Sequence, residues 1–185
     1  DNGDGTCTAE FLPHSSDGHV GKSDGTWAIA HDAPIGDTVG YIQDQLFVQS
    51  VREGSSFYIN RGFFTFNTDS LPDGAQIISA DLSFVPIYQE STDNDIEDYL
   101  GVFKSTREDP LSLTIADYNK CSSVDGGRID FTQILTHNRN TIFINSPANE
   151  IINPLGWTML CLRTGNDDQN IVPMPLNGAT DLILI

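Results

Sequence analysis

Turn signals recur at short intervals along this chain of 185 residues, and they constrain its fold more than any other feature. Short runs of β-branched and aromatic residues lie between them, and no long segment shows the 3.6-residue period of a helix. Short strands separated by frequent turns are typical of antiparallel sandwiches and barrels. The sequence therefore predicts an all-β fold. The turn signals are Asp17-Gly18, Asp24-Gly25, Glu53-Gly54, Asp73-Gly74, Asp125-Gly126-Gly127, Gly165-Asn166 and Asn177-Gly178.

The clearest predicted strand covers residues 57–67, which are rich in aromatic residues. The next covers 75–88, where Ile78, Leu82 and Phe84 alternate with polar residues. Alternation with a period of two predicts a sheet with one packed face and one face in water. Further strands are expected at 45–51, 99–104, 127–131, 140–145, 157–163 and 181–185, and one short helix at 113–119 with Ser112 or Thr114 as its cap.

The net charge of −17 excludes several classes of partner. Such an acidic chain repels phosphate backbones, so we expect no nucleic-acid partner. No apolar run approaches the ~18 residues of a membrane-spanning helix. The hydrophobic share of 38% is too high for a disordered acidic tail and is sufficient for the core of one domain. Asp accounts for 20 of the 26 acidic residues, and Asp is favoured in turns and metal-binding loops.

Acidic clusters in the predicted loops are candidate calcium ligands, because Ca²⁺ binds carboxylate and carbonyl oxygens. The first five residues, Asp-Asn-Gly-Asp-Gly, resemble part of a calcium loop but lack the closing Glu of an EF-hand. Each cluster also fits a solvated turn, so both interpretations stay open. The candidate Ca²⁺ ligands are Asp1, Asp4, Asp93, Asp95, Asp167 and Asp168.

The chain contains three cysteines, Cys7, Cys121 and Cys161. The number is odd and no C-x-x-C pair occurs, which argues against a zinc module. A disulfide among them would suit an exported protein and would leave one thiol over, whereas Cys161 also fits a small buried apolar residue. The chain begins at Asp1, as a secreted protein does after removal of its signal peptide. We therefore expect an extracellular location.

The N-terminal segment differs from the rest of the chain. Residues 6–12 alternate, with Cys7, Ala9 and Phe11 on one side, and a polar stretch follows them. We therefore divide the chain into an N-terminal arm, residues 1–16, with a strand-like segment, and a β-sandwich domain, residues 17–185.

The C-terminal run that contains Leu182 and Leu184 is apolar on both faces, so both faces need cover. Each end of the chain fits an ordinary strand of its own sheet. Each also fits a strand that completes the sheet of a neighbouring subunit. The candidate assembly residues are Cys7, Ala9, Phe11, Leu182 and Leu184.

Residues 61–75, Arg-Gly-Phe-Phe-Thr-Phe-Asn-Thr-Asp-Ser-Leu-Pro-Asp-Gly-Ala, carry a resemblance to a known family. With the weaker matches at 17–28, 116–118 and 156–163, they are similar to the DNRLRE-type domains related to carbohydrate-binding module family 96. The resemblance covers roughly residues 17–185 and implies a jelly-roll-like sandwich of two antiparallel sheets on an exported protein. Polysaccharide-binding and cell-surface proteins occur among the relatives. Within the motif, Arg61 is either exposed or buried with a carboxylate partner.

No motif of a serine hydrolase, zinc protease or phosphate-binding loop occurs, so we expect a protein without enzymatic activity. The first hypothesis is a structural subunit of an extracellular filament, tube or surface layer, a homo-oligomer or polymer. Deletion of residues 1–16 should then abolish assembly. The second hypothesis is a carbohydrate-binding module that recognises extracellular polysaccharide, with Trp27 and Tyr41 as exposed aromatic platforms.

Overall fold

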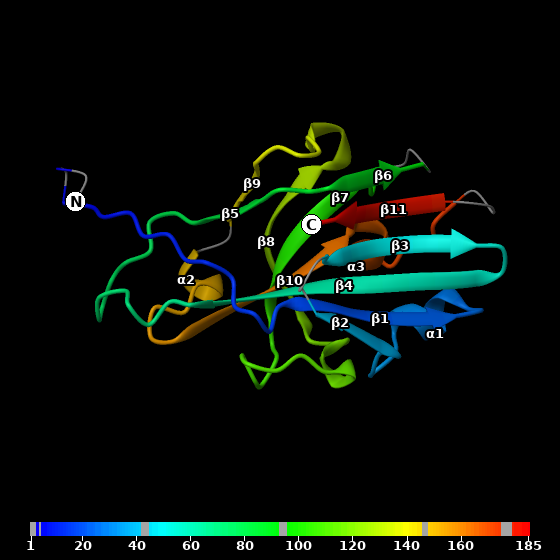
Figure 1. Ribbon diagram of the computed structural model, residues 1–185, viewed down its shortest axis with the longest axis horizontal. Helices are drawn as coiled ribbons and strands as arrows, with labels where there is room; N and C mark the ends of the chain where they lie inside the picture. The colour runs from blue at the N-terminus through cyan, green and yellow to red at the C-terminus, as the bar shows by residue number, and fades with distance from the viewer. Residues whose placement is uncertain (1–2, 4, 42–44, 93–95, 146–147, 175–178) are drawn as a thin grey trace.

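The computed structural model is an antiparallel, mostly β fold whose main sheet is strongly curled (Figure 1). It describes all residues except 1–2, 4, 42–44, 93–95, 146–147 and 175–178. The strands are β1 Gly18–Asp24, β2 Thr38–Tyr41, β3 Phe47–Glu53, β4 Ser56–Asn67, β5 Asp81–Phe84, β6 Tyr88–Ser91, β7 Tyr99–Ser105, β8 Cys121–Asp130, β9 Asn140–Phe143, β10 Trp157–Thr164 and β11 Ala179–Leu184. The helices are α1 Trp27–His31, α2 Ala148–Ile151 and α3 Gly165–Gln169, with short 3₁₀ turns η1 Ile115–Asp117 and η2 Phe131–Gln133.

The long strand β4 organises the main sheet. On one side its residues 57–63 pair with β1. On the other side residues 56–60 pair with β3, and residues 62–67 pair with β10. The sheet therefore divides at β4 into one branch, β3–β11–β6, and a second branch, β10–β7–β8. In the described part of the chain β5 and β9 form a separate two-stranded ribbon.

Gly62 occupies the position on β4 where the two branches separate. A Cβ atom there would lie 2.9 Å from Val48, 3.0 Å from Leu46 and 3.3 Å from Leu162. These three side chains belong to the first hydrophobic core. The absence of a side chain at Gly62 thus lets the start of β3 and the end of β10 approach β4 closely.

Strand β4 contributes side chains to a core on each of its faces, which explains why buried apolar residues occupy both odd and even positions along it. Phe57, Ile59 and Phe63 pack in a core beneath α1, with Tyr118 and Cys161. The opposite face contributes Phe64 to the larger core, which contains the inner residues of β3, β7, β10 and β11 and of the β5–β9 ribbon. The strand predicted at 57–67 is confirmed.

The strand predicted over 75–88 is much shorter in the structure. Only β5 forms within it, and β6 begins at its last residue. Leu82 and Phe84 are buried as the alternation predicts, but Ile78 is 74% exposed. The pairing partner β9 has only four residues, so the ladder ends where β9 ends.

The predicted helix at 113–119 is the 3₁₀ turn η1, which Thr114 precedes as its cap residue. The Asp117 carboxylate accepts a hydrogen bond from the Thr114 backbone N–H at 2.8 Å. Strands β1 and β2 had no sequence signal, because they are rich in glycine and polar residues. Gly18 and Gly40 lie so close that a Cβ on Gly18 would overlap the Gly40 carbonyl oxygen.

The arm meets the body at its C-terminal end. Pro13 forms a bridge with Phe66, and the His14 backbone N–H donates to the Thr65 carbonyl oxygen at 2.9 Å. The structure assigns no strand to residues 6–12, so the strand-like segment does not form a ladder in its own chain. Figure 1 shows the blue N-terminal segment leaving the body on the side opposite α1.

Candidate functional site

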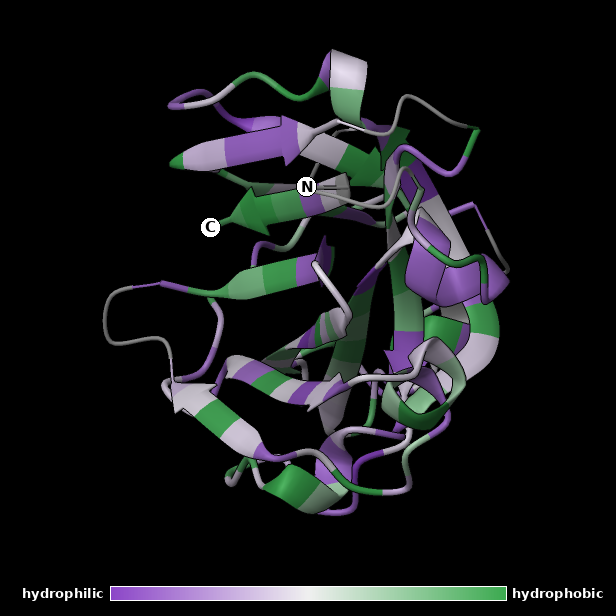
Figure 2. Cartoon of the chain, turned by 90° about the vertical axis from the view of Figure 1, so that its right-hand side faces the viewer, coloured by the Kyte–Doolittle hydropathy of each residue, from purple (hydrophilic) through white to green (hydrophobic). Residues whose placement is uncertain are grey.

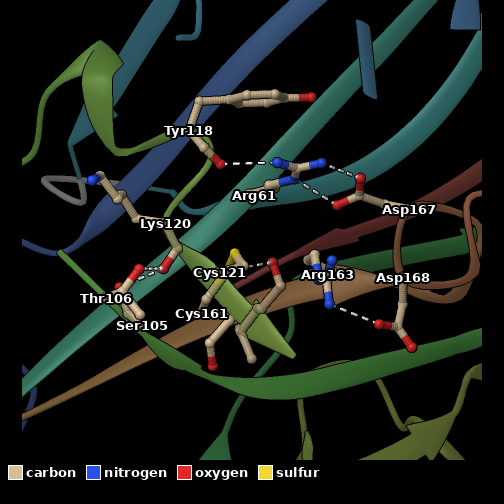
Figure 3. The surroundings of a disulfide bond; sticks show 12 residues. Arg61, Ser105, Thr106, Tyr118, Lys120, Cys121, Cys161, Arg163, Asp167 and Asp168 are labelled. Atoms are coloured by element: carbon tan, nitrogen blue, oxygen red, sulfur yellow. Dashed lines mark hydrogen bonds and ion pairs between the residues drawn. A yellow bond between two sulfur atoms is a disulfide. The ribbon is translucent and has the colours of Figure 1, made fainter. Parts of the chain in front are cut away.

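A buried ion pair lies at the centre of the smaller core (Figure 3). Arg61 on β4 donates through Nε and Nη2 to the two carboxylate oxygens of Asp167 in α3, at 2.8 and 2.6 Å. Nη1 donates to the Tyr118 carbonyl oxygen at 3.0 Å, and the guanidinium lies 4.2 Å from the Tyr118 ring centre. Arg61 is therefore buried with a carboxylate partner rather than exposed.

The pair keeps both groups charged. Burial alone would raise the pKa of Asp167, but the guanidinium of Arg61 outweighs burial and lowers it. Burial likewise favours a lower pKa for Arg61, and the Asp167 carboxylate raises it instead. The hydrogen bonds of Arg61 join β4 to α3 and to the residue that follows η1.

The carboxylates of Asp167 and Asp168, two of the expected metal ligands, accept hydrogen bonds from arginine and tyrosine side chains. Asp168 accepts from Arg163 at 2.7 Å and from the Tyr99 hydroxyl at 2.7 Å. Burial and this carboxylate raise the pKa of Tyr99 to about 12. The other expected ligands, Asp1, Asp4, Asp93 and Asp95, lie outside the described residues. Among the residues described, no group of three or more His, Cys, Asp or Glu is placed to hold a metal.

A disulfide joins Cys121 on β8 to Cys161 on β10, the strands on either side of β7 (Figure 3). Cys161 is fully buried, so it is both a disulfide partner and a core residue. Cys7 is a free, exposed cysteine in the arm. The disulfide therefore leaves one thiol over, as expected from the odd number of cysteines.

The root of the arm contains a buried carboxyl group. Asp17 is 1% exposed and accepts the Thr65 backbone N–H at 2.8 Å through Oδ1. Burial raises the pKa of Asp17 to about 7, although the Thr65 N–H and the nearby Arg107 guanidinium act against it. Ser16 donates to the Pro110 carbonyl oxygen at 2.9 Å, which fixes the same turn to the body.

Beyond this root the arm is largely exposed. Cys7, Ala9 and Glu10 are exposed, Phe11 is half-buried and Leu12 is 81% exposed. Glu10 forms a surface ion pair with Arg139 at 3.1 Å. The apolar arm residues Cys7, Ala9 and Phe11 are thus available for contact with another molecule.

The C-terminal strand β11 lies between β3 and β6 in its own sheet. Ile183 is fully buried, whereas Leu182 and Leu184 point to the other face and are half-buried. Figure 2 shows β11 as a hydrophobic strand beside the hydrophilic β6. Because β11 is paired on both sides, it is an internal strand of its own sheet.

The two expected aromatic platforms have different outcomes. Trp27 is only 5% exposed, and its indole N–H donates to Asn170 at 2.8 Å, so the expectation that it is an exposed platform is wrong. The short helix α1 turns its ring inward against Phe57. Tyr41 is 54% exposed, but its hydroxyl donates to the Leu113 carbonyl oxygen at 2.8 Å.

A shallow groove that the sequence did not reveal lies on the outer face of β3, β4, β6 and β11. Its volume is about 320 Å³. The groove arises from the register of four strands that are distant in sequence, so no local pattern could identify it. It is lined by Gln49, Val51, Glu53, Tyr58, Glu90, Thr180 and Leu182.

The fold and these sites define a class: an all-β protein with a curled antiparallel sheet, one internal disulfide and an exposed N-terminal arm. No protein-family model matches the chain. No curated protein matches it either. None of the helices among the described residues is long and apolar enough to cross a membrane.

Proposed function

We propose that this protein is a non-enzymatic structural subunit of an extracellular polymer, and that its N-terminal arm adds as a strand to a neighbouring copy. The carrying observation is the exposure of the arm. Leu12 is 81% exposed, and Cys7 and Ala9 are exposed beside it on a segment that projects from the body (Figure 1). Burying one side chain such as Leu12 in a neighbouring copy contributes roughly 1.5–3 kcal/mol toward docking of the arm.

The arm has the pattern that strand addition requires. Backbone hydrogen bonds supply affinity in this mode of recognition, and alternate side chains supply specificity. Cys7, Ala9 and Phe11 form the apolar face of such a strand. A contact between one surface and a different surface on the next copy extends into a fibre when it does not close into a ring.

One feature of the structure supports an extracellular location. The Cys121–Cys161 disulfide is typical of oxidising compartments. The finer architecture that we propose is a jelly-roll-like sandwich, in which the β3–β11–β6 branch and the β10–β7–β8 branch enclose the larger core.

We also propose that Ca²⁺ bound by surface carboxylates offsets the net charge of −17 between neighbouring copies.

Deletion of residues 1–12 tests the proposal. It removes the exposed segment and keeps His14, Ser16 and Asp17, which bind the body. We expect the truncated protein to fold with unchanged circular dichroism and to remain monomeric, whereas the full chain forms polymers in negative-stain electron microscopy. Polymers of the truncated protein that match those of the full chain would contradict the role of the arm.

The second candidate function, recognition of extracellular polysaccharide, is favoured by one specific observation, the groove on the outer sheet face. Trp27 is buried, and Tyr41 is exposed but does not line this groove, so recognition at the groove would depend on other residues.

A further inference from the structure

A second groove lies at an open edge of strand β10. This strand pairs with β4 along residues 157–162, but its ladder with β7 begins only at Leu160. Among the described residues, 157–159 therefore have no strand partner on the β7 side. A groove of about 270 Å³ lies here, between this edge and the segment 150–154 at the end of α2. An open strand edge is a template for pairing with another chain.

Apolar side chains form much of the groove. Trp157 and Met159 line it from β10, and Ile152 and Pro154 line it from the segment after α2. All four are only half-buried, so an incoming apolar side chain would cover more of their surface. None of the described arm residues lines the groove, so the chain does not fill it with its own arm.

The two faces of the open edge differ in chemistry. Cys161 packs in the smaller core and Leu160 in the larger core. Because side chains alternate along a strand, Trp157 and Met159 lie on the same face as Cys161. Lys104 is the registered partner of Leu160 and lies on the other face. A strand added at this edge would meet apolar side chains on one face and a lysine on the other.

The arm has the alternation that matches these two faces. Its side chains Cys7, Ala9 and Phe11 share one face, and Glu10 points to the other. When Phe11 and Ala9 face the apolar side of the groove, Glu10 is therefore on the side of Lys104. No ion pair among the described residues involves Lys104, so its ammonium group is available to a carboxylate of another chain.

Charge favours this groove over the one on the outer sheet face. The first twelve residues of the chain contain three acidic residues and no lysine or arginine. The outer groove is lined by Glu53 and Glu90 without a lysine or arginine, and it repels such a segment. In the groove at β10, Lys104 balances Glu150. An acidic arm therefore meets less repulsion at β10.

The arm and the groove lie on opposite sides of the β4–β10 pair. Phe66 pairs with Thr158 of β10 on one side and with Pro13 of the arm on the other. The groove opens on the edge of β10 that faces away from β4. A contact between the arm of one copy and the groove of the next thus joins two different surfaces, and such a contact can continue from copy to copy.

We propose that this groove receives the N-terminal arm of a second copy, which adds as a strand antiparallel to residues 157–159 of β10. Phe11 packs against Trp157, Ala9 lies beside Met159, and Glu10 is directed toward Lys104. This inference rests on the proposed function, because it names the acceptor for the donated strand.

Disulfide trapping in the full chain tests the contact. Cys7→Ser removes the native free thiol, and Ala9→Cys with Met159→Cys places one thiol on the arm and one in the groove. Mild oxidation should link the copies into a ladder of multimers on non-reducing gels. The matched control replaces Met159→Cys by Tyr41→Cys, because Tyr41 lies on β2, which also has an open edge in the described part of the chain but does not line the groove.

Charge reversal tests the same contact independently. Lys104→Glu in the trapping variant should reduce the ladder by about threefold or more, because it places two carboxylates together. Adding Glu10→Lys to that chain should restore the ladder. Arg139→Glu is the control, since Arg139 is the partner of Glu10 within the single chain, and it should not weaken the ladder. Thermal melting verifies that every variant is folded.

The outcomes separate this contact from the proposed function. A cross-link confined to single chains would place the arm in its own groove and overturn the proposal. A ladder formed equally well with Tyr41→Cys would also overturn it. Electron microscopy of the same samples reports on assembly: polymers without a ladder would overturn the groove as acceptor and keep the proposed function, whereas a chain that forms neither would contradict both.

Discussion

At the scale of single residues, Arg61 and Asp167 show how a buried charge is tolerated in the middle of an apolar strand. Arg61 is 2% exposed, and every nitrogen of its guanidinium donates a hydrogen bond. Removing one member of a buried pair leaves the other charge without compensation. That loss usually exceeds the net contribution of the intact pair to stability.

Arg61→Met should therefore lower the free energy of unfolding by about 3–5 kcal/mol, measured by urea denaturation. The double variant Arg61→Met with Asp167→Leu should recover most of that loss, because it removes the isolated carboxylate as well. Arg139→Ala is the control, since its ion pair with Glu10 is exposed and contributes under about 1 kcal/mol. Equal effects of Arg61→Met and Arg139→Ala would contradict the structural role of the buried pair.

The buried carboxyl of Asp17 predicts a pH dependence of stability. Its pKa rises from 3.8 to about 7 on folding, so between these values the folded state binds the proton that the unfolded state has lost. The contribution of Asp17 is thus fully present below about pH 4, and it falls as the pH rises through 7. A shift of this size corresponds to a decrease of at most about 4 kcal/mol.

Asp17→Asn keeps an oxygen acceptor for the Thr65 N–H and cannot titrate. Urea denaturation at several pH values should show a smaller loss of stability between pH 4 and pH 8 in this variant than in the native chain. Asp73→Asn removes an exposed carboxylate and serves as the control. Identical pH profiles for the native chain and Asp17→Asn would refute the assignment.

At the scale of elements, Gly62 lets two branches of the sheet meet at one strand. Gly62→Val would place a β-branched side chain against Val48, Leu46 and Leu162, and overpacking of this kind costs about 1–3 kcal/mol. A shift in the urea midpoint measures the loss. Gly25→Ala should change stability little, because the nearest atom to a Cβ at Gly25 is 3.7 Å away. A Gly62→Val protein as stable as Gly25→Ala would contradict this description of the branch point.

The elements that sequence predicted best are those buried on both faces. Strands β4 and β10 have buried apolar residues on both faces, because each lies between neighbouring strands and contributes to both cores. Strand β1 could not be predicted from the sequence, because two of its residues are glycines, which lie close to Gly40 and Asn60 and give no apolar alternation. The helix α3 was not predicted from the sequence, because its first residues, Gly-Asn-Asp, are also typical of a turn.

The candidate sites were predictable only in part. The partner of Arg61 lies 106 residues away, so the need for a carboxylate could be stated but its identity could not. Trp27 lies in a segment rich in Gly and Asp that is typical of an exposed loop, yet a five-residue helix turns it into the core. The groove depends on the register of four strands, which no short segment encodes.

At the scale of the whole molecule, the net charge of −17 opposes close packing of identical subunits. If Ca²⁺ offsets this charge, a chelator at low salt should shift polymers toward monomers, and added salt should partly restore them because it screens repulsion. The fraction of protein that sediments in an ultracentrifuge measures this change. A sedimenting fraction that is the same with Ca²⁺ and with chelator at low salt would contradict a role for Ca²⁺ in holding the copies together.

The free thiol of Cys7 reports most directly on whether the arm of one copy is buried in the next. Cys7 is exposed in the single chain, and it shares the apolar face of the arm with Ala9 and Phe11. Native polymers and monomers are treated with a maleimide reagent, and denatured polymer gives the total thiol. We predict rapid labelling of the monomer and at least tenfold slower labelling of the polymer. Equal labelling rates in monomer and intact polymer would contradict strand donation by the arm.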